Sequence, residues 1–523
     1  MLRDLLIALS LSNLCFLREW REFLSGNLSL YSKVPPTNNL LGIQLNVLLL
    51  ATVLWIAFLL AQRQRNRFAM PLARWAFFLL VVANLRMSRL GFDLFERWRW
   101  AGLAVWLLLL GLIVFAFRRW QRRILQACVA LVLIFSPFLL VTFSQAIWQL
   151  IQIRTQSFAD RATAPVLPPR PAGPRVLWLV FDEFDQRHAF IERAPSVELP
   201  ELDRLRARAL YASNAYPPAR KTELSMPAMM TGKLVSKARP YGSDELLITY
   251  GGAAEAVRWS TQPNIFSSAR ELGFNTAMFG WYHAYCRVIA GSLTACSWRE
   301  GLLLGALRRD ASLPGSMLDQ VRDLLNILFS LERLGVLSRE GRNREQRQKL
   351  IRDHQELMAG GLKAAGDPNF GLVMVHLPAP HPPGIYDRRK HDFSAEDSAG
   401  YLDSLVLTDR TVGEFCRALE AAGLWDSTVV LVTSDHWWRA DFWKTQPYWT
   451  PEEAAAYGGK LDHRIPFLLK LPRQKQGVAY DREFNTVLSH DLVLALLRGE
   501  LSSEESVVRW LDQHRSIGES PYN

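Results

Sequence analysis

Long apolar runs with few interruptions dominate the first 148 residues of the chain. A helix needs roughly 20 apolar residues to cross a hydrocarbon core of about 30 Å, so runs of this length predict membrane-spanning helices. Buried helices of a soluble domain are the alternative, but so many long runs within one short region disfavour it. We expect about five spans in an α-helical transmembrane bundle covering residues 1–148, at Leu5–Phe16, Leu40–Leu60, Met70–Asn84, Ala101–Phe117 and Leu125–Phe143.

A different pattern begins after this region. Residues 149–174 form a connector, whose five prolines between Ala164 and Pro174 favour an extended, stiff spacer. Across residues 175–523, short apolar runs alternate with helical patterns, which predicts an α/β sandwich with a largely parallel central sheet. The expected strands are 175–181, 275–279, 369–377, 427–433 and 465–471, and the expected helices include 199–210, 264–272 and 395–424.

Arginines next to the apolar runs predict the orientation of the chain in a membrane. The segments Gln62–Phe68 and Arg118–Arg123 are rich in Arg and, with five spans, share one side with the N-terminus. Positively charged loops stay in the cytoplasm, so the part after the fifth span is expected in the periplasm of a bacterial inner-membrane protein. Arginines in Arg86–Arg99 fall on the opposite side and weaken this inference. The net charge of +11 comes without a basic stripe interleaved with aromatics, so we expect no nucleic-acid partner.

The five cysteines fit no metal-binding framework. Cys286 and Cys296 bracket a short loop and could form a disulfide in an oxidising compartment, although spacing alone leaves this open. Cys15, Cys128 and Cys416 lie in apolar or helical patterns, where we expect them to pack.

Three segments far apart in the sequence carry the candidate chemistry. Asp182-Glu183 follows one apolar run, Asp435-His436 follows another, and Thr222 begins the segment that ends at Gly232. Functional groups gather at the carboxyl ends of parallel strands, so these residues are candidates for one site. Carboxylates and imidazole bind divalent cations, and the histidine favours zinc, with manganese, magnesium or calcium as alternatives.

A metal ion near Thr222 would let its hydroxyl act as a nucleophile near neutral pH. The apolar run Met226–Met230 predicts a helix, which would place Thr222 at a helix N-terminus that favours an anion. Taken alone, Thr222 is better explained as a helix cap without chemistry. The coincidence of the three segments is what favours a metal-activated threonine.

These segments resemble the alkaline phosphatase/sulfatase superfamily over about residues 175–500. The resemblance rests on Val176–Glu183, Thr222–Gly232, Val430–His436 and Asn485–Leu497. With the apolar N-terminal part, the chain is most similar to the membrane-anchored branch of phosphoethanolamine transferases and lipoteichoic acid synthases. The resemblance implies one metal ion, with the nucleophile and its neighbours as ligands: Glu183, Thr222, Asp435 and His436, and Asp182 as a further ligand.

The same resemblance separates this chain from sulfatases that use formylglycine. Those enzymes carry Cys or Ser at the nucleophile position, then Pro two residues later and Arg four residues later. Here these places hold Thr222, Leu224 and Met226, a pattern that resembles phosphoethanolamine transferases instead. Trp437 and Trp438 replace a glycine common in the family, and Trp437 is a candidate wall for an unusual headgroup, or simply packs.

Further substrate contacts follow from the resemblance. His381 resembles the family histidine that contacts the phosphate or protonates the leaving group, and His463 resembles a substrate or second-metal ligand. Lys221, next to the nucleophile, is a candidate for binding the donor phosphate, although an exposed cation often has no such role. We expect His376 to pack in the core.

The expected function is transfer of a phospholipid headgroup through a phospho-threonine at Thr222. The donor would be a membrane phospholipid such as phosphatidylethanolamine or phosphatidylglycerol, and the acceptor a cell-envelope lipid or glycan. One alternative is a hydrolase of the same superfamily, in which water is the acceptor. Another is a membrane scaffold or sensor with an inactive catalytic fold.

Overall fold

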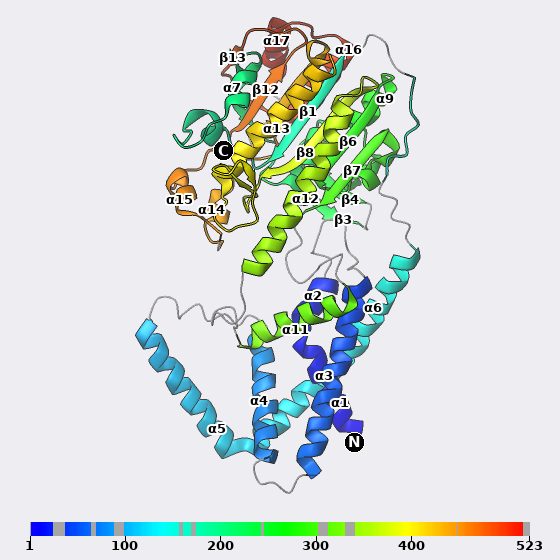
Figure 1. Ribbon diagram of the computed structural model, residues 1–523. Helices are drawn as coiled ribbons and strands as arrows, with labels where there is room; N and C mark the ends of the chain where they lie inside the picture. The colour runs from blue at the N-terminus through cyan, green and yellow to red at the C-terminus, as the bar shows by residue number, and fades with distance from the viewer. Residues whose placement is uncertain are drawn as a thin grey trace. The chain divides into compact units, whose positions relative to one another are not determined.

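The chain divides into two compact units in the computed structural model (Figure 1). The first contains residues 1–28, 32–157 and 303–338, and the second contains residues 29–31, 158–302 and 339–523. We expected residues 303–338 in the catalytic domain, whereas in the structure they cluster with the first unit. The structure describes residues 2–24, 37–63, 69–87, 99–155, 161–168, 174–241, 245–301, 312–329, 340–446 and 448–515.

The first unit consists of helices in its described residues. They are α1 (Leu2–Cys15), α2 (Leu17–Leu24), α3 (Thr37–Arg63), α4 (Ala69–Met87), α5 (Arg99–Ile134), α6 (Ser136–Thr155) and α11 (Leu313–Phe329). Two helical stretches, Thr37–Arg63 and Gly111–Ile151, are long and apolar enough to cross a membrane.

The described residues therefore contain two candidate spans and not the expected five. The apolar part of α4, Met70–Val82, is shorter than a span, and α1 has 14 residues. The last two expected spans, Ala101–Phe117 and Leu125–Phe143, meet at a kink inside α5, where Trp120 leaves helical geometry, and the second span runs on into α6 (Figure 1). The arginine segment Arg118–Arg123 thus lies at this kink between two helical stretches. Residues 64–68 and 88–98, which hold the other arginine-rich segments, lie mostly outside the described residues.

Helix α11 packs against α3 through buried polar groups (Figure 1). Asn46 Nδ2 donates to Gln320 Oε1 at 2.9 Å and to the Met317 carbonyl at 3.0 Å. Gln320 Nε2 in turn donates to the carbonyl of Asn39 at 2.9 Å. Leu324 joins the apolar core of this unit. A segment from the second half of the sequence thus completes the packing of an N-terminal helix.

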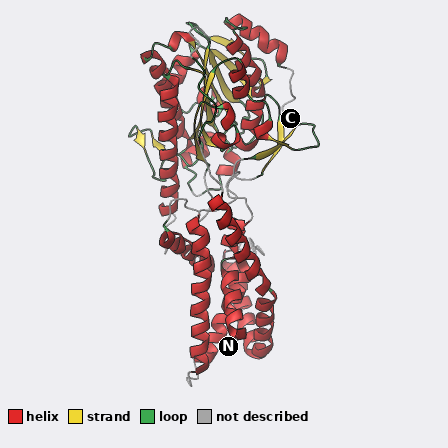
Figure 2. Ribbon diagram, turned by 90° about the vertical axis from the view of Figure 1, so that its right-hand side faces the viewer, coloured by secondary structure: helices red, strands yellow, loops and turns green. Residues whose placement is uncertain are grey.

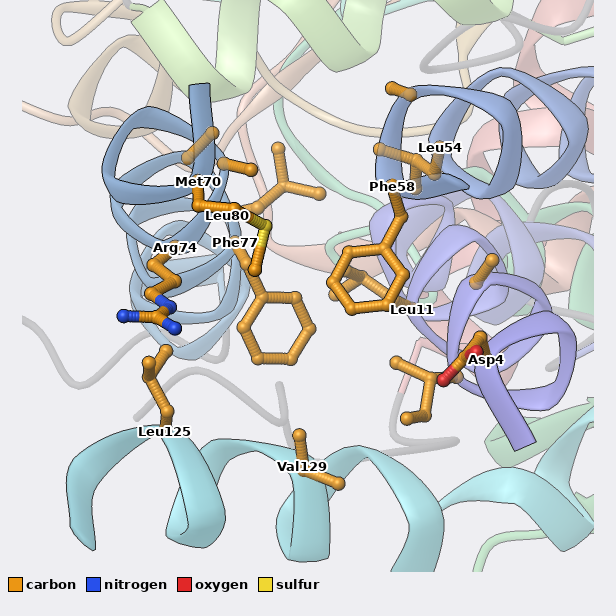
Figure 3. A pocket seen from close by; sticks show the side chains of 15 residues that line it. Asp4, Leu11, Leu54, Phe58, Met70, Arg74, Phe77, Leu80, Leu125 and Val129 are labelled. Atoms are coloured by element: carbon orange, nitrogen blue, oxygen red, sulfur yellow. The ribbon is translucent and has the colours of Figure 1, made fainter. Parts of the chain in front are cut away.

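An apolar cavity of about 420 Å³ lies among α1, α3, α4 and α5 (Figure 3). Leu54, Phe58 and Phe77 contribute to its lining. Asp4 and Arg74 also line it, and in this view they lie on opposite sides.

A large, mostly parallel sheet forms the centre of the second unit, with helices on both sides (Figure 2). The strand order is β13-β2-β12-β11-β1-β8-β6-β7, with β14 paired to β2, and only β12 runs antiparallel to its neighbours. The expected α/β architecture is confirmed. The strands are β1 (Arg175–Asp182), β2 (Leu210–Tyr216), β6 (Asn275–Tyr282), β7 (Ala295–Glu300), β8 (Phe370–Pro380), β11 (Thr428–Ser434), β12 (Ile465–Lys470), β13 (Val478–Tyr480) and β14 (Phe484–Asn485).

Successive side chains of β1 point to opposite faces of the sheet, and apolar side chains are buried on both faces. Val176, Trp178 and Val180 belong to one apolar core, whereas Leu177 and Leu179 belong to the other. A strand buried on both faces reads as a continuous apolar run, as expected for a parallel sheet. One face packs on α8 (Thr222–Thr231), α9 (Ile265–Glu271), α16 (Ser489–Arg498) and α17 (Glu504–His514), and the other on α7 (Pro200–Arg206), α12 (Glu340–Ala365) and α13 (Tyr401–Ala421).

The remaining described elements are short. A separate sheet contains β3 (Val235–Pro240), β4 (Leu246–Tyr250) and β5 (Val257–Arg258), and a small hairpin contains β9 (Tyr386–Asp387) and β10 (Asp392–Phe393). Short helices are α10 (Tyr285–Val288), α14 (Ala440–Trp443) and α15 (Pro451–Tyr457). Residues 161–168 of the expected connector have no regular structure, and Leu167 bonds Asn275 through both its N–H and its carbonyl.

Candidate active site

The pairing register of β1 with β11 and with β8 places the carboxyl ends of these three strands side by side. Phe181 of β1 pairs with Ser434 of β11 and with Leu377 of β8. Asp182 ends β1, and Asp435 directly follows β11, so their side chains emerge at the same edge of the sheet. This arrangement brings together residues separated by about half the length of the chain.

Thr222 lies against these residues as the first residue of α8. Its Oγ1 donates to Asp182 Oδ2 at 3.4 Å and lies 3.3 Å from His436 Nε2. The side chain is buried, and its carbonyl accepts a hydrogen bond from His283 Nε2 at 3.0 Å. The expected position at a helix N-terminus is confirmed, and it leaves the unpaired N–H groups of the first turn near this hydroxyl.

Two histidines direct Nε2 toward the same pocket. His436 Nδ1 donates to the Trp437 carbonyl at 3.0 Å, and Nε2 lies 3.4 Å from Asp182 Oδ1. His376 Nδ1 donates to the Trp281 carbonyl at 3.0 Å, and Nε2 lies 3.9 Å from Asp435 Oδ2. A proton held on Nδ1 by a carbonyl leaves Nε2 with its lone pair, the form in which imidazole binds metals.

Three ligand-type atoms in this pocket are buried without a hydrogen-bond partner among the described residues. They are Asp182 Oδ1, Asp435 Oδ2 and His376 Nε2. Buried polar atoms are normally paired, because an unpaired one keeps its full desolvation cost. Ligand atoms of Asp182, His376 and Asp435 lie within 4.8 Å of one another. A divalent cation fits this donor set, and its imidazole and carboxylate groups suit zinc or manganese.

Burial dominates the electrostatics of the two aspartates and two histidines. It raises the pKa of Asp435 to about 7. It also raises the pKa of Asp182 well above its usual value, with a further contribution from the charge of Asp435. Burial lowers the pKa of His376 to about 3 and that of His436 well below its usual value, so both are neutral ligands near pH 7. A cation between the carboxylates would favour their ionised forms.

Glu183 has different contacts from those we expected for a metal ligand. An oxygen of its carboxylate lies within 4.8 Å of ligand atoms of Asp182 and His436. However, Oε1 accepts a hydrogen bond from Arg439 Nε at 2.6 Å, and Oε2 accepts one from Trp443 Nε1 at 2.7 Å. Asp182, expected as the additional ligand, instead has the unpaired oxygen.

The other expected substrate residues, His381, His463, Trp437 and Lys221, make contacts mainly with aromatic rings or with neighbouring charges. The ring of His381 packs between Trp281 and Trp443, with centroid distances of 5.2 and 5.0 Å. His463 packs on Trp437 at 4.4 Å. Trp437 itself is buried. Lys221 is exposed, and its Nζ pairs with Glu223 at 3.4 Å.

Two histidines at the site were missed from the sequence. His376 was expected to pack, yet it contributes an unpaired Nε2 to the pocket. Its position near the carboxyl end of a predicted strand was the available signal, because the other candidate ligands follow strands in the same way. His283 follows β6, and no motif pointed to its bond with the Thr222 carbonyl.

The open question about Cys286 and Cys296 is answered by a disulfide between them. It ties α10 to β7 next to the site, because Tyr285 on α10 has its hydroxyl 3.0 Å from His376 Nδ1. Cys15, Cys128 and Cys416 are buried free thiols, as expected.

Comparisons with known proteins match the chain to one family model. The family model described as Sulfatase matches residues 174–498. No curated protein sequence matches the chain.

Solved structures of low sequence identity are also similar to the chain. PsFucS1 sulfatase from Pseudoalteromonas sp. is 15% identical, covering 66% of this chain and 76% of its own, with a TM-score of 0.40. Phosphonate monoester hydrolase of Agrobacterium radiobacter is 15% identical, covering 64% and 78%, with a TM-score of 0.36. The lipoteichoic acid synthase LtaP from Listeria monocytogenes is 15% identical, covering 63% and 75%, with a TM-score of 0.37.

Proposed function

Because the chain belongs to the sulfatase family, we propose that this enzyme transfers a phospholipid headgroup through a covalent intermediate on Thr222. The observation that carries the proposal is the position of Thr222 Oγ1, 3.4 Å from Asp182 Oδ2 and 3.3 Å from His436 Nε2. A hydroxyl at the rim of a cluster of unpaired ligand atoms is placed for activation as a nucleophile.

Asp182, Asp435, His436 and His376 would hold one divalent ion together with Thr222. When bound, the ion lowers the pKa of a coordinated hydroxyl and stabilises negative charge on phosphoryl oxygens. Thr222 would give its hydroxyl proton to solvent, Oγ1 would form a bond to phosphorus, and the bond from phosphorus to the diacylglycerol oxygen would break. That oxygen takes a proton from solvent and leaves as diacylglycerol. His283, which bonds the Thr222 carbonyl, orients the nucleophile during this step.

His381 supports the second half of the reaction. Burial and the charge of Arg439 lower its pKa to about 3, so its imidazole is neutral near pH 7. An acceptor hydroxyl would attack the phospho-threonine and pass its proton by way of His381 to solvent, and Thr222 Oγ1 would be released and take a proton from solvent. The expected role of His381, contacting the phosphate or protonating the leaving group, stays a prediction.

A lipid donor and a periplasmic location form part of the proposal. Two described helices long and apolar enough to span a membrane support attachment to a lipid surface. The Cys286–Cys296 disulfide supports an oxidising compartment for the second unit. We therefore place a multi-pass protein in a bacterial inner membrane, with phosphatidylethanolamine or phosphatidylglycerol as donor and a cell-envelope lipid or glycan as acceptor.

The mass of the adduct on Thr222 tests this proposal. Purified full-length protein with its metal would be incubated with each phospholipid separately, quenched in acid and digested. We expect the Thr222 peptide to carry phosphoethanolamine or phosphoglycerol, and Thr222→Ala to carry no adduct and to lose turnover at least 1,000-fold, on the order of losing a catalytic nucleophile. An unmodified Thr222 with full turnover in Thr222→Ala would refute the nucleophile assignment.

Product analysis distinguishes transfer from hydrolysis by the same superfamily chemistry. With a labelled headgroup and an added lipid acceptor, transfer gives labelled acceptor, whereas hydrolysis gives only the free phosphorylated headgroup. Both begin with the same covalent intermediate, so the adduct alone does not separate them.

A further inference from the structure

Glu183 and Arg439 form a buried ion pair at the edge of the candidate active site. Arg439 Nε and Nη2 both lie 2.6 Å from Glu183 Oε1, and Trp443 Nε1 donates to Oε2. The Glu183 side chain has no exposed area. Both carboxylate oxygens are therefore occupied, and the negative charge is already compensated by a guanidinium.

Arg439 differs from its partner because part of it reaches solvent. Its side chain is 21% exposed. Nη1 has no hydrogen-bond partner among the residues that the structure describes. The backbone N–H of Arg439 lies 3.4 Å from Glu183 Oε2, and its guanidinium carbon is 5.7 Å from the ring centroid of Trp443, so the group is held from several sides. A fixed guanidinium with a remaining N–H pair is suited to bind an anion.

The held guanidinium borders the pocket of unpaired ligand atoms. The Glu183 oxygen near it belongs to a carboxylate within 4.8 Å of ligand atoms of Asp182 and His436. Arg439 is also three residues after His436, directly before α14.

We propose that Glu183 anchors Arg439 and that Arg439 Nη1 binds a non-bridging oxygen of the tetrahedral anion on the substrate. This inference rests on the proposed function, because it assigns a substrate contact in the same site. It gives Glu183 a positioning role in place of the metal-ligand role that the resemblance implied. The substrate class is a phosphoester that keeps a negative charge on phosphorus.

A purely structural ion pair is the competing explanation, and two measurements on full-length protein separate the two. The first is metal content per protein after loading and desalting. The second is inhibition of turnover by inorganic phosphate, used as a probe of the anion site. The variants are Asp182→Asn, Glu183→Gln, Arg439→Lys and the double substitution Glu183→Gln/Arg439→Gln, which removes both charges together and leaves no unpaired buried charge.

We expect the double variant and Arg439→Lys to keep the metal content of the parent, while Asp182→Asn loses it. Phosphate inhibition should weaken roughly 10- to 100-fold in the double variant, as expected for one lost charge-assisted hydrogen bond. In Arg439→Lys, the KM for the phospholipid should rise more than kcat falls, because a lysine cannot bond Glu183 and the anion in the same geometry.

Two results would overturn this assignment. Loss of metal in Glu183→Gln and in the double variant, equal to the loss in Asp182→Asn, would make Glu183 a metal ligand. Unchanged phosphate inhibition in folded double variant would make the pair structural only. Failure of the proposed function is visible separately, because the parent would then bind metal and phosphate but give no adduct on Thr222.

Discussion

His376 is the residue whose role depends most on the three-dimensional structure. Its Nδ1 is bonded to the Trp281 carbonyl, and its Nε2 lies among carboxylates without a hydrogen-bond partner in the described part of the chain. Asp182, Asp435 and His436 were predictable from the sequence, because each comes where an apolar strand ends. His376 lies inside β8 near the end of the strand predicted at 369–377, and the register between β1 and β8 shows that this strand extends to the same pocket.

We expect His376→Ala to lower metal affinity about 10- to 100-fold, because one ligand atom is lost from the cluster. Tyr285→Phe should weaken it less, since only the hydroxyl next to Nδ1 is removed. Titration of the chelated protein with zinc, followed by a competing chromophoric chelator, measures this. His354→Ala is the matched control, since His354 is equally buried but lies 3.4 Å from Thr411 instead of the acidic cluster. Equal affinities in His376→Ala and the parent would exclude His376 as a ligand.

The raised pKa of Asp435 predicts the sign of a pH effect on stability. In the metal-free folded state this pKa is about 7, whereas the ordinary value is 3.8. The folded state therefore holds a proton that the unfolded chain has released, and the metal-free protein loses stability as pH rises between these values. Metal binding requires the ionised carboxylate, so added zinc should raise Tm more at about pH 8 than at about pH 5.

Differential scanning fluorimetry with and without chelator checks this pH effect. Asp435→Asn serves as the control, because it removes the titrating group, and the decline in metal-free stability should become shallower in it. The prediction would be contradicted if the Tm of the metal-free parent rose steadily over this pH range, in the same way as the Tm of Asp435→Asn.

At the scale of elements, apolar runs predicted the central strands well, whereas strands with polar residues were not recognised from the sequence. β1, β8 and β11 read as continuous apolar stretches, because helices cover both faces of the sheet. β2 contains Ser213 and Asn214 and was not predicted. The antiparallel direction of β12 depends on chain connectivity, which composition does not reveal.

The Cys286–Cys296 disulfide holds α10, and with it Tyr285, against β7. We expect Cys286→Ser/Cys296→Ser to lower the free energy of unfolding of the second unit by about 2–3 kcal/mol, because the unfolded chain gains freedom. Pulse proteolysis in urea measures the change. The parent treated with dithiothreitol should approach the double variant, and a difference within about 0.5 kcal/mol between oxidised parent and variant would argue against a stabilising bond.

At the scale of the whole molecule, the two units are interleaved along the chain. Residues 303–338 leave the second unit, and α11 within them buries Ser316, Gln320 and Leu324 in the first. Sequence alone could not predict this membership, because α11 is an amphipathic helix that would suit either unit. Its partners, Asn39 and Asn46, are more than 270 positions earlier.

A version of the protein cut to residues 158–523 should therefore self-associate. It would keep α11 but lose the partners of Gln320 and Leu324, exposing an apolar helix face that favours association. Replacing residues 303–338 by a flexible Gly/Ser linker should restore a monodisperse protein with a bound metal. Size-exclusion chromatography with light scattering compares the two. Monodisperse behaviour of the version that keeps α11 would show that this helix does not need α3.

The contact between Asn46 and Gln320 also sets an order of events during synthesis. A ribosome that has just added Asn46 of α3 must add 274 more residues before it reaches Gln320. In that interval β1, β2, β6 and β7 are all synthesised, while Asn46 on α3 still lacks its hydrogen-bond partner on α11. Packing of the helical unit around α3 therefore cannot finish until much of the sheet has been synthesised, which makes it a late step.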